Sequence, residues 1–336
     1  MATTTLTLTA AVRSHGGALP LLSDAIAMDG LRLDHITVEP QIAAYRRMVR
    51  DLAFDICELA PTTYLCAKAF NKPFTAIPVF LTRDFHHRSV VCNVASGIKT
   101  PQDLLGKKFG VRAYTVTTGV WTRGILESEY GVDPAQVTWY TDDEEHVTEW
   151  VAPPNVRKVP PGESLAEMIA AGRLDAALSG MAGIGRSGPP TANWEAAAAQ
   201  AVAAPTAAQL VPLFPNARAL ETEWYQRTKI FPMHGLIVIK NAVLAEHPWV
   251  AAELLRAFQA SKEIHLTRLA DAGPSTADDR HILETQEMIG GGDPLPFGLE
   301  ANRPTIEALI QYAYSQKIIP VKVEPEAVFA PKALDL

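Results

Sequence analysis

The sequence predicts an α/β protein built of two αβ lobes. Its 336 residues are enough for about two domains of roughly 150 residues each. Strand-like and helix-like segments alternate over residues 6–81, at the spacing typical of a parallel sheet with helices on both faces. A break follows, and then a second alternating set that forms its own small sheet.

The first set begins with a strand over Leu6–Ala11, within a stretch where apolar and polar residues alternate. The turn residues Arg13–Gly17 join this strand to the first helix. The other expected strands are Ile36–Glu39, Phe54–Glu58 and Phe74–Leu81, and the expected helices are Pro20–Met28, Ala43–Asp51 and Thr62–Phe70. Their alternation indicates parallel strands joined by crossover helices.

The second set follows the same alternation. The expected strands are Ser89–Val94, Lys107–Val111, Val137–Tyr140 and Ala176–Leu178, and the expected helices are Ile98–Gly106, Thr117–Tyr130 and Leu165–Ala171. The alanine-rich segment Ala192–Ala208 is biased in composition, so we interpret it as a surface insertion or lid.

The remaining segments return to the first lobe. They are a strand over Leu236–Lys240 and helices over Pro248–Ala270, Ala277–Met288 and Thr305–Lys317. The two long helices are amphipathic, so we expect them to pack on the first domain. Residues 1–93 and 236–336 are therefore predicted to form lobe I and residues 94–235 lobe II, with the chain crossing between the lobes twice.

Composition and charge exclude several classes of protein. The 30 Lys and Arg residues against 37 Asp and Glu residues give a net charge of −7, which argues against a nucleic-acid binder. No apolar run reaches the roughly 20 residues of a membrane span. The three cysteines, Cys57, Cys66 and Cys92, form no CxxC pair and suggest buried thiols in a reducing compartment. The first ten residues lack Lys and Arg, so we expect a cytoplasmic protein unless a signal was trimmed away.

Two motifs are weak, and a zinc-binding spacing is absent. Gly183–Gly188 matches GxGxxG, but Pro189 and Pro190 follow and block the helix that a dinucleotide site needs. Ser14–Gly17 faintly resembles an oxyanion loop, yet no GxSxG elbow exists in the chain. No HExxH or similar spacing supports zinc. The acidic run Asp142–His146 is expected to be a solvated loop.

Four places are candidates for ligand contact. Arg13 and His15 follow the first strand, where open α/β folds bind ligands. The turn Arg112–Gly119 leads into a helix, whose first N–H groups and hydroxyls suit a carboxylate or phosphate. His86–Arg88 lies at the first crossover, where one of the two histidines is expected to face the cleft. His234 stands just before the strand that returns to lobe I.

Two segments resemble a known fold. Ser96–Val111 and Ser164–Ala177 are similar to segments of the second lobe of type II periplasmic binding proteins. This resemblance implies two αβ lobes with a central cleft and two crossover strands.

A narrower resemblance covers most of the chain from about Phe80 onward. Four separate blocks are similar to the 4,5-dihydroxyphthalate decarboxylases: Val120–Leu126, Glu223–His234, Phe297–Thr305 and Val328–Pro331. The resemblance implies a cytosolic carboxy-lyase that converts 4,5-dihydroxyphthalate to protocatechuate and CO2. Three positions depart from the family pattern, namely His86 in place of an arginine, Met181 in place of an arginine and Ala113 in place of an acidic residue. The exact substrate is therefore left open.

This chemistry suggests roles for the candidate residues. Loss of CO2 requires protonation of the ring carbon, an acceptor at the phenol and cations or dipoles for the carboxylates. We assign His87 and Glu58 to proton transfer and His234 to the phenol, as the catalytic residues. The substrate-binding candidates are Arg13, His15, His86, Arg88, Arg112, Tyr114, Thr117, Thr118 and Arg123. Arg123 has a structural ion pair as its alternative role.

No organic cofactor is predicted, because the ring hydroxyls supply the electrons, and no spacing in the sequence indicates a metal ligand set. The expected partner is a small aromatic carboxylate, without nucleic acid or membrane, and the oligomeric state, the metal dependence and the proton donor are left open. The main alternative is a solute-binding protein of an ABC importer for an aromatic or other small organic acid. A pyrimidine- or thiamine-precursor synthase would need a Cys- or His-rich iron site, which the sequence lacks.

Overall fold

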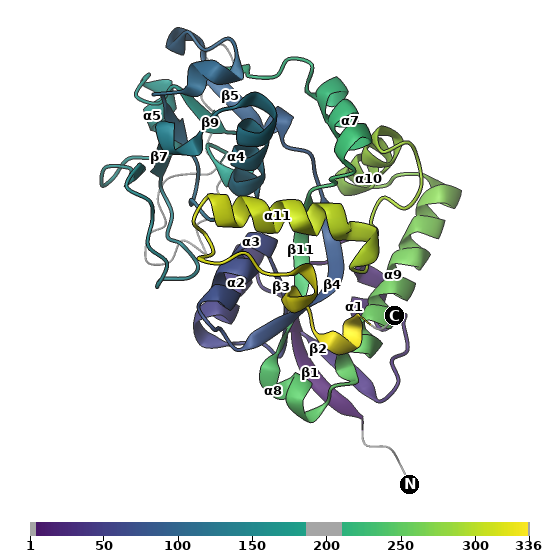
Figure 1. Cartoon of the computed structure of the whole chain (residues 1–336). Helices are drawn as coiled ribbons and strands as arrows, with labels where there is room; N and C mark the ends of the chain where they lie inside the picture. Colours follow the sequence, from purple (N-terminus) through teal and green to yellow (C-terminus); the bar gives the residue numbers. More distant parts are fainter. Residues whose placement is uncertain (1–4, 186–209, 335–336) are drawn as a thin grey trace. The chain divides into compact units, whose positions relative to one another are not determined.

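The computed structural model describes residues 5–185 and 210–334, and the chain divides into two compact units (Figure 1). Unit 1 takes in Met1–Asp84, Trp224–Ile310 and Lys322–Leu336, and unit 2 takes in Phe85–Glu223 and Gln311–Val321. The segment Ala192–Ala208, interpreted above as an insertion or lid, lies outside the described residues.

Unit 1 is built on a five-stranded mixed sheet with the strand order β2-β1-β3-β11-β4. Its strands are β1 (Leu6–Ala11), β2 (Leu31–His35), β3 (Ile56–Leu59), β4 (Phe74–Arg83) and β11 (Met233–Lys240). β1 pairs in parallel with β2 and β3, which confirms the predicted parallel arrangement there. β11 is antiparallel to both of its neighbours, β3 and β4, so the sheet is not wholly parallel.

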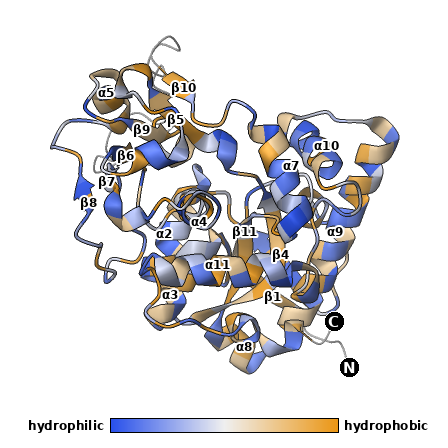
Figure 2. Ribbon diagram, turned by 45° about the horizontal axis from the view of Figure 1, so that its top comes forward, coloured by the Kyte–Doolittle hydropathy of each residue, from blue (hydrophilic) through white to orange (hydrophobic). Residues whose placement is uncertain are grey.

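Helices cover both faces of this sheet. The α-helices that lie wholly within unit 1 are α1 (Leu19–Leu22), α2 (Gln41–Asp51), α3 (Pro61–Ala69), α8 (Asn241–Glu246), α9 (Val250–Ala272) and α10 (Ala277–Met288). Ile237 of β11 and Ile77 of β4 share one core with Phe258 of α9. Leu236 and Phe80 line a hollow with α3, and since successive strand residues point to opposite faces, this is the other side of the sheet. Figure 2 shows α9 in both hydrophilic and hydrophobic colours, as expected of a helix with one buried face.

Unit 2 contains a six-stranded mixed sheet with the strand order β10-β5-β9-β6-β7-β8. Its strands are β5 (Val90–Asn93), β6 (Lys108–Gly110), β7 (Thr138–Thr141), β8 (Val156–Lys158), β9 (Ala176–Leu178) and β10 (Leu210–Pro212), and the sheet is accompanied by α4 (Thr117–Tyr130) and α5 (Leu165–Ala170). β8 and β10 are absent from the sequence prediction. Each has only three residues, too few to show a period of alternation.

The units differ from the predicted boundaries, 1–93 with 236–336 and 94–235, in three places. β5 belongs to the sheet of unit 2, because it pairs with β9 and β10. Residues 224–235 belong to unit 1, where the Phe231 carbonyl accepts a hydrogen bond from Arg83. Residues 311–321 group with unit 2, where Gln316 accepts a hydrogen bond from Arg123. The chain therefore passes from one unit to the other four times, where two passages were predicted. Two of these boundaries fall within helices, α7 (Ala217–Thr228) and α11 (Arg303–Ser315).

Two local predictions in unit 1 are wrong. The helix expected over Pro20–Met28 is only α1, because Asp24 has a left-handed backbone with φ of 57° and the Ser23 hydroxyl bonds the Leu19 carbonyl. The strand expected over Ile36–Glu39 lies earlier, as β2, which pairs with β1 from Leu31 onward. The bounds predicted for β1, α4, β9 and α10 are confirmed.

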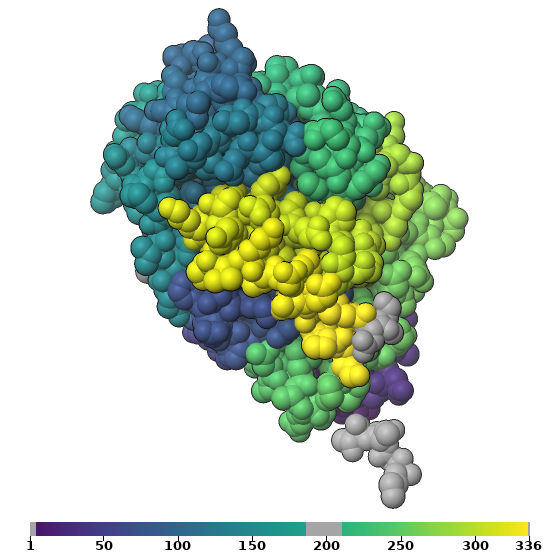
Figure 3. Space-filling view, viewed as in Figure 1, coloured from purple at the N-terminus to yellow at the C-terminus, as the bar shows by residue number. Residues whose placement is uncertain are grey.

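The last residues of unit 1 run along β4. Phe329 bridges Ala76 in parallel, and the Ala330 N–H donates to the Ala76 carbonyl at 2.8 Å. Figure 3 shows this C-terminal segment in yellow on the surface of unit 1. The segment extends the sheet at β4 and protects that edge.

Candidate active site

A buried carboxylate, Glu58, lies near the end of β3 and gathers side chains from three segments of unit 1. Its side chain is only 2% exposed, and it accepts a hydrogen bond from the backbone N–H of Arg13 at 3.0 Å. The Nε2 atom of His15 lies 3.1 Å from each of its oxygens, and the Tyr45 hydroxyl donates to it at 3.0 Å. We refer to Arg13, His15, Tyr45 and Glu58 as the Glu58 cluster.

Sheet pairing explains why the Glu58 cluster forms. Ala11, the last residue of β1, is in register with Cys57 of β3, so the residues that follow β1 lie beside Glu58. On the other side, Gly235 of β11 has φ of 61°, and a Cβ atom there would lie 2.7 Å from Glu58 Oε1. Only glycine leaves room for the carboxylate at this position.

The charge of the cluster follows from its pKa shifts. Burial raises the pKa of the Glu58 carboxyl, but the nearby His15 and Arg13 outweigh burial, so the pKa is lowered overall. Burial next to the same carboxylate raises the pKa of Tyr45 well above its ordinary value. At neutral pH Glu58 is therefore ionised and Tyr45 keeps its proton. Glu58 is an acceptor in this state and has no proton to donate.

His15 and Arg13 are held together in a defined way. Arg13 Nη2 lies 2.8 Å from His15 Nδ1, and a guanidinium can only donate. Arg13 Nε lies 3.3 Å from His15 Nδ1 and 3.2 Å from Nε2, so the guanidinium meets both ring nitrogens. The shorter contact at Nδ1 and the two Glu58 oxygens at Nε2 favour the tautomer in which Nδ1 accepts and Nε2–H faces Glu58. The His15 ring is buried, whereas Arg13 is exposed. The cluster thus presents one exposed cation above a buried imidazole.

His15 also lines a hollow within unit 1, of about 460 Å³ including its open mouth. On one side lie residues 81–83 at the end of β4, and on another lies α10. The lining residues of α10 have the spacing i, i+3, i+4 and i+7, which is one face of a helix: Asp278, His281, Ile282 and Thr285. Within unit 1 the hollow joins the cluster to α10.

The start of α10 is fixed against the loop that carries His15. Thr276 and Asp279 form a capping box at its first turn. Asp279 also accepts a hydrogen bond from Arg268 at 2.8 Å and lies 3.4 Å from His265 Nε2. A Cβ atom on Gly16 would lie 2.2 Å from the His265 ring, so the loop after β1 packs directly on His265. The contacts between these groups hold the two walls of the hollow in register.

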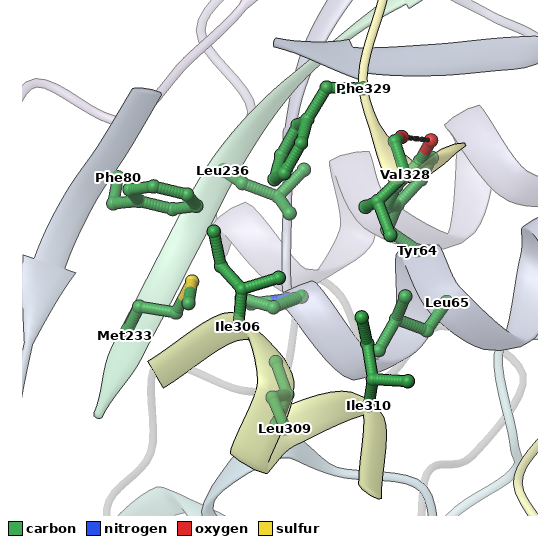
Figure 4. Close-up of a pocket in the computed structure, with 11 residues that line it drawn as sticks. Tyr64, Leu65, Phe80, Met233, Leu236, Ile306, Leu309, Ile310, Val328 and Phe329 are labelled. Carbon is green, nitrogen blue, oxygen red and sulfur yellow. Dashed lines mark hydrogen bonds between the residues drawn. The ribbon is translucent and has the colours of Figure 1, made fainter. Parts of the chain in front are cut away.

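A second hollow of unit 1 is apolar. It measures about 260 Å³ including its open part, and Phe80, Met233 and Leu236 lie around it (Figure 4). Within this lining the hydroxyl of Tyr64 donates to the Val328 carbonyl. A charged or hydroxylated ligand would lose its hydrogen bonds with water there, so this hollow does not suit an aromatic acid.

His234, predicted to contact the phenol, lies half-buried on β11. Burial lowers the pKa of its imidazole to about 4, although Asp84 partly opposes this shift. Its carbonyl accepts a hydrogen bond from the Thr82 hydroxyl at 3.1 Å. His234 is therefore neutral at pH 7, and its role at the phenol stays a prediction.

In unit 2, the turn before α4 holds a carboxylate of the chain itself. Glu145 accepts hydrogen bonds from the N–H groups of Tyr114 at 2.6 Å and Thr115 at 3.1 Å. The Arg112 guanidinium lies 3.9 Å from the Asp143 carboxylate. The acidic run around these residues is thus packed against the turn, and the expectation of a solvated loop is wrong. Glu145 thus engages the N–H groups of Tyr114 and Thr115, and anion binding by the first N–H groups of α4 stays a prediction.

Arg123 is fully buried in α4. Its Nε donates to Gln316 at 2.7 Å, and its guanidinium lies 3.8 Å from the centre of the Tyr114 ring. These contacts favour a structural role for Arg123, through hydrogen bonds and a cation–π contact. Thr117 and Thr118 form the first turn of α4, the former buried and the latter half-buried.

The predicted crossover histidines, His86 and His87, lie in the interior of unit 2. The His87 ring is 5.1 Å from the Phe214 ring, and its Nδ1 is 3.9 Å from Glu221 Oε1. Burial lowers the pKa of His87 to about 4. Arg88 is exposed, and its N–H donates to Glu221 at 3.2 Å. The described contacts of His87 are thus those of a neutral side chain packed among other side chains of unit 2.

Sequence reasoning missed Tyr45, Gly235, Glu145 and His281. Glu145 lies in the acidic run Asp142–His146, but the contacts of all four residues become visible only through pairing with a distant segment. The spacing of Asp278, His281, Ile282 and Thr285 is a signal in the sequence, but which face of α10 meets a hollow depends on the tertiary fold.

Several expectations remain without a described counterpart. Within residues 5–185 and 210–334, no three His, Cys, Asp or Glu side chains converge to hold a metal ion, and the metal question stays a prediction. In the same part of the chain no helix has the length and apolar character needed to cross a membrane. Of the departures from the family pattern, Met181 is 54% exposed and Ala113 is buried.

Comparison with solved structures identifies the fold. The periplasmic aliphatic sulphonate binding protein SsuA of Escherichia coli matches with a TM-score of 0.51 at 12% identity, covering 98% of this chain and 99% of that one. A putative periplasmic sulfonate-binding protein of Methylobacillus flagellatus KT matches with a TM-score of 0.53 at 11% identity, covering 99% and 93%. At such low identities the likeness shows the fold alone, and this fold is that of the periplasmic binding proteins.

Comparison of sequences identifies the family, although no family model matches the chain. A 4,5-dihydroxyphthalate decarboxylase of Comamonas testosteroni is 28% identical over 98% of this chain and 98% of its own length. A protein of the same name from Pseudomonas putida is 33% identical over 181 residues, which are 52% of this chain and 70% of that protein. This chain belongs to the 4,5-dihydroxyphthalate decarboxylase family.

Proposed function

We propose that the chain is a carboxy-lyase that converts 4,5-dihydroxyphthalate to 3,4-dihydroxybenzoate (protocatechuate) and CO2. The names of the two relatives support this reaction class. The bond between a ring carbon and its carboxylate breaks, the electron pair stays on the ring, and a proton takes the place of the CO2. The ring hydroxyls donate electron density to the carbon that is protonated, so the step needs no organic cofactor.

The observation that carries the proposal is the Glu58 cluster. An ionised, buried carboxylate faces the Nε2 of His15 at 3.1 Å, and an exposed arginine lies 2.8 Å from the Nδ1 of the same ring. A positively charged imidazole formed at this place is balanced by Glu58, as the carboxylate balances the histidine in a Ser-His-Asp triad. The cluster therefore combines a binding site for a carboxylate with a group that can give a proton.

In the proposed step, substrate binding changes the partner of Arg13. A guanidinium binds a carboxylate through two parallel hydrogen bonds, which draws Arg13 away from the His15 ring. His15 Nδ1 then takes up a proton from solvent, while Nε2–H stays on Glu58. The imidazolium gives the Nδ1 proton to the ring carbon as CO2 leaves. Arg13 thus acts as a carboxylate ligand, His15 as the acid and Glu58 as the residue that positions His15.

The proposal gives no step to His87 or Arg123. The His87 side chain is 1% exposed and neutral at pH 7, because burial lowers its pKa to about 4. The guanidinium of Arg123 is engaged by groups of unit 2. Proton transfer, which the sequence assigned to His87, is therefore given to His15 in this proposal. Binding of the carboxylate, for which Arg123 was a candidate, is given to Arg13.

Incubation of the purified chain with 4,5-dihydroxyphthalate tests the proposal. The expected result is release of CO2 and 3,4-dihydroxybenzoate in equal amounts. Binding of the compound without CO2 release would contradict it, and would support a receptor for aromatic acids instead. Parallel reactions with a chelator decide whether turnover needs a metal ion.

Variants separate the roles. His15→Gln keeps an amide hydrogen for Glu58 but cannot carry a proton, so kcat should fall by roughly 10²–10⁴-fold. Arg13→Gln should mainly raise KM, because it removes a carboxylate ligand. His247→Gln is the control, since this half-buried histidine of unit 1 lies outside the cluster and pairs with Glu246 at 3.6 Å. Equal activity of His15→Gln and His247→Gln would remove His15 from the mechanism.

A further inference from the structure

We infer that the hollow beside His15 binds the hydroxyl edge of the aromatic ring, and that His281 and Asp278 of α10 select a dihydroxylated ring over an unsubstituted one. This inference rests on the proposed function and adds the specificity-determining residues. Both residues line the hollow together with His15, so a ring placed there reaches all three.

The tautomer of His281 supports its role as an acceptor. Its Nε2 lies 3.0 Å from the Arg83 carbonyl, which can only accept, so Nε2 carries the hydrogen. In this tautomer the lone pair is on Nδ1, which can accept a hydrogen bond from a phenolic O–H. Asp84 Oδ1 lies 3.6 Å from the same Nε2 and reinforces this tautomer.

Charge decides which edge of the ring meets α10. The carboxylate of Asp278, on an exposed residue of the same helix face, repels the carboxylates of a phthalate and accepts hydrogen bonds from hydroxyls. Arg13, a residue of the Glu58 cluster, attracts the carboxylates instead. A dihydroxyphthalate therefore turns its hydroxyls toward α10 and its carboxylates toward Arg13, which leaves the ring carbon near His15.

Besides Thr82, Arg83 and Thr285, the remaining lining includes apolar side chains that suit a flat ring. Leu81, Ile282 and Leu295 supply apolar side chains around the hollow. The position of α10 relative to the His15 loop is maintained by Asp279 and His265, as described above. The acceptors are thus presented on a fixed helix and not on a loop, which favours discrimination between ligands.

Binding of two non-reactive probes tests the inference. Benzoate has the carboxylate alone, and 3,4-dihydroxybenzoate adds the two hydroxyls, so the ratio of their dissociation constants isolates the hydroxyl contribution. We expect calorimetry on the unaltered chain to give 3,4-dihydroxybenzoate an advantage of roughly tenfold or more, from two hydrogen bonds. In the double variant Asp278→Ala/His281→Phe the ratio should fall close to one, while benzoate binding changes little.

Glu284→Ala is the matched control, an exposed acid of α10 that is absent from the lining of the hollow. It should keep the ratio of the unaltered chain. The inference is overturned if the double variant keeps the ratio, if both probes weaken equally, or if the unaltered chain shows no preference. Because this readout is binding, it is separate from CO2 release, whose absence would overturn the proposed function.

Discussion

Each unit contains a buried histidine beside a buried glutamate, and the two pairs differ in almost every other respect. In unit 1 the distance from His15 Nε2 to Glu58 is 3.1 Å, and the pair lies beside an exposed arginine and a hollow. In unit 2 the distance from His87 Nδ1 to Glu221 is 3.9 Å, and aromatic rings pack on the imidazole.

This difference shows why burial of a histidine–carboxylate pair does not by itself indicate chemistry. Burial lowers the pKa of His87 to about 4, and the charge of Glu129 opposes this shift only in part. Around Glu58 the charges and hydrogen bonds of His15 and Arg13 outweigh the effect of burial, so the pKa of the Glu58 carboxyl is lowered. An ionised carboxylate is therefore kept beside His15, whereas His87 is neutral at pH 7.

The largest expected effect comes from removing the carboxylate of Glu58, which accepts the hydrogen bonds of the cluster in unit 1. Glu58→Ala leaves the donors of Arg13, His15 and Tyr45 without their acceptor inside the protein, so the free energy of unfolding should fall by roughly 3–5 kcal/mol. Urea denaturation at pH 7 measures this change. Tyr45→Phe, which removes a single donor, should cost only about 1 kcal/mol. Equal losses in the two variants would show that Glu58 is not the centre of the cluster.

A smaller loss is expected from disturbing the loop that carries His15. In Gly16→Ala the new Cβ atom meets the His265 ring at 2.2 Å, so stability should fall by about 1–3 kcal/mol. Gly17→Ala is the matched control, because its nearest neighbour would be Leu295 at 3.8 Å, an ordinary contact. Adding His265→Ala should relieve the clash, so the costs of the two changes should not add. Additive costs would place the strain elsewhere.

The sequence predicted the framework of these regions better than their contacts. β1 and α10 were predicted with the bounds that the structure has, since alternation or capping marks their ends locally. β2 was misplaced, because propensity favoured Ile36–Glu39 while pairing with β1 selects the preceding residues.

In the candidate site, too, local patterns indicate some residues and long-range contacts determine the others. Arg13, His15 and Glu58 were singled out because each follows or ends a strand, which sequence alone indicates. Tyr45 and Gly235 belong to the same cluster through contacts over sequence separations that no local pattern encodes. The place of His87 at the crossover, together with the family resemblance, favours a catalytic role, and its surroundings of aromatic side chains can be seen only in the fold.

The dependence of stability on pH below pH 7 distinguishes His87 from His15. The folded pKa of His87 is about 4 against an ordinary value of 6.5, so between these values the unfolded chain binds more protons. The contribution of His87 to stability is therefore complete above about pH 6.5 and is lost as the pH falls toward 4. His87→Phe should make this acid loss shallower in denaturation series from pH 7 to pH 4 and leave turnover intact. His15→Phe should abolish turnover, and an equal loss of turnover in both would restore His87 to the mechanism.

The smallest effect is expected at Glu145, the carboxylate that occupies the turn of unit 2. Glu145→Ala exposes the N–H groups of Tyr114 and Thr115, which water can solvate because Glu145 is half-buried, so stability should change by about 1 kcal/mol or less. The vacated donors form an anion site at the start of α4, so sulfate should raise the Tm of this variant more than that of the unaltered chain. Glu144→Ala, at the exposed neighbouring position, controls for the change in net charge. An equal sulfate response in all three proteins would mean that Glu145 only closes the loop, whereas a selective response would mean that unit 2 binds carboxylates with its backbone and unit 1 with its side chains.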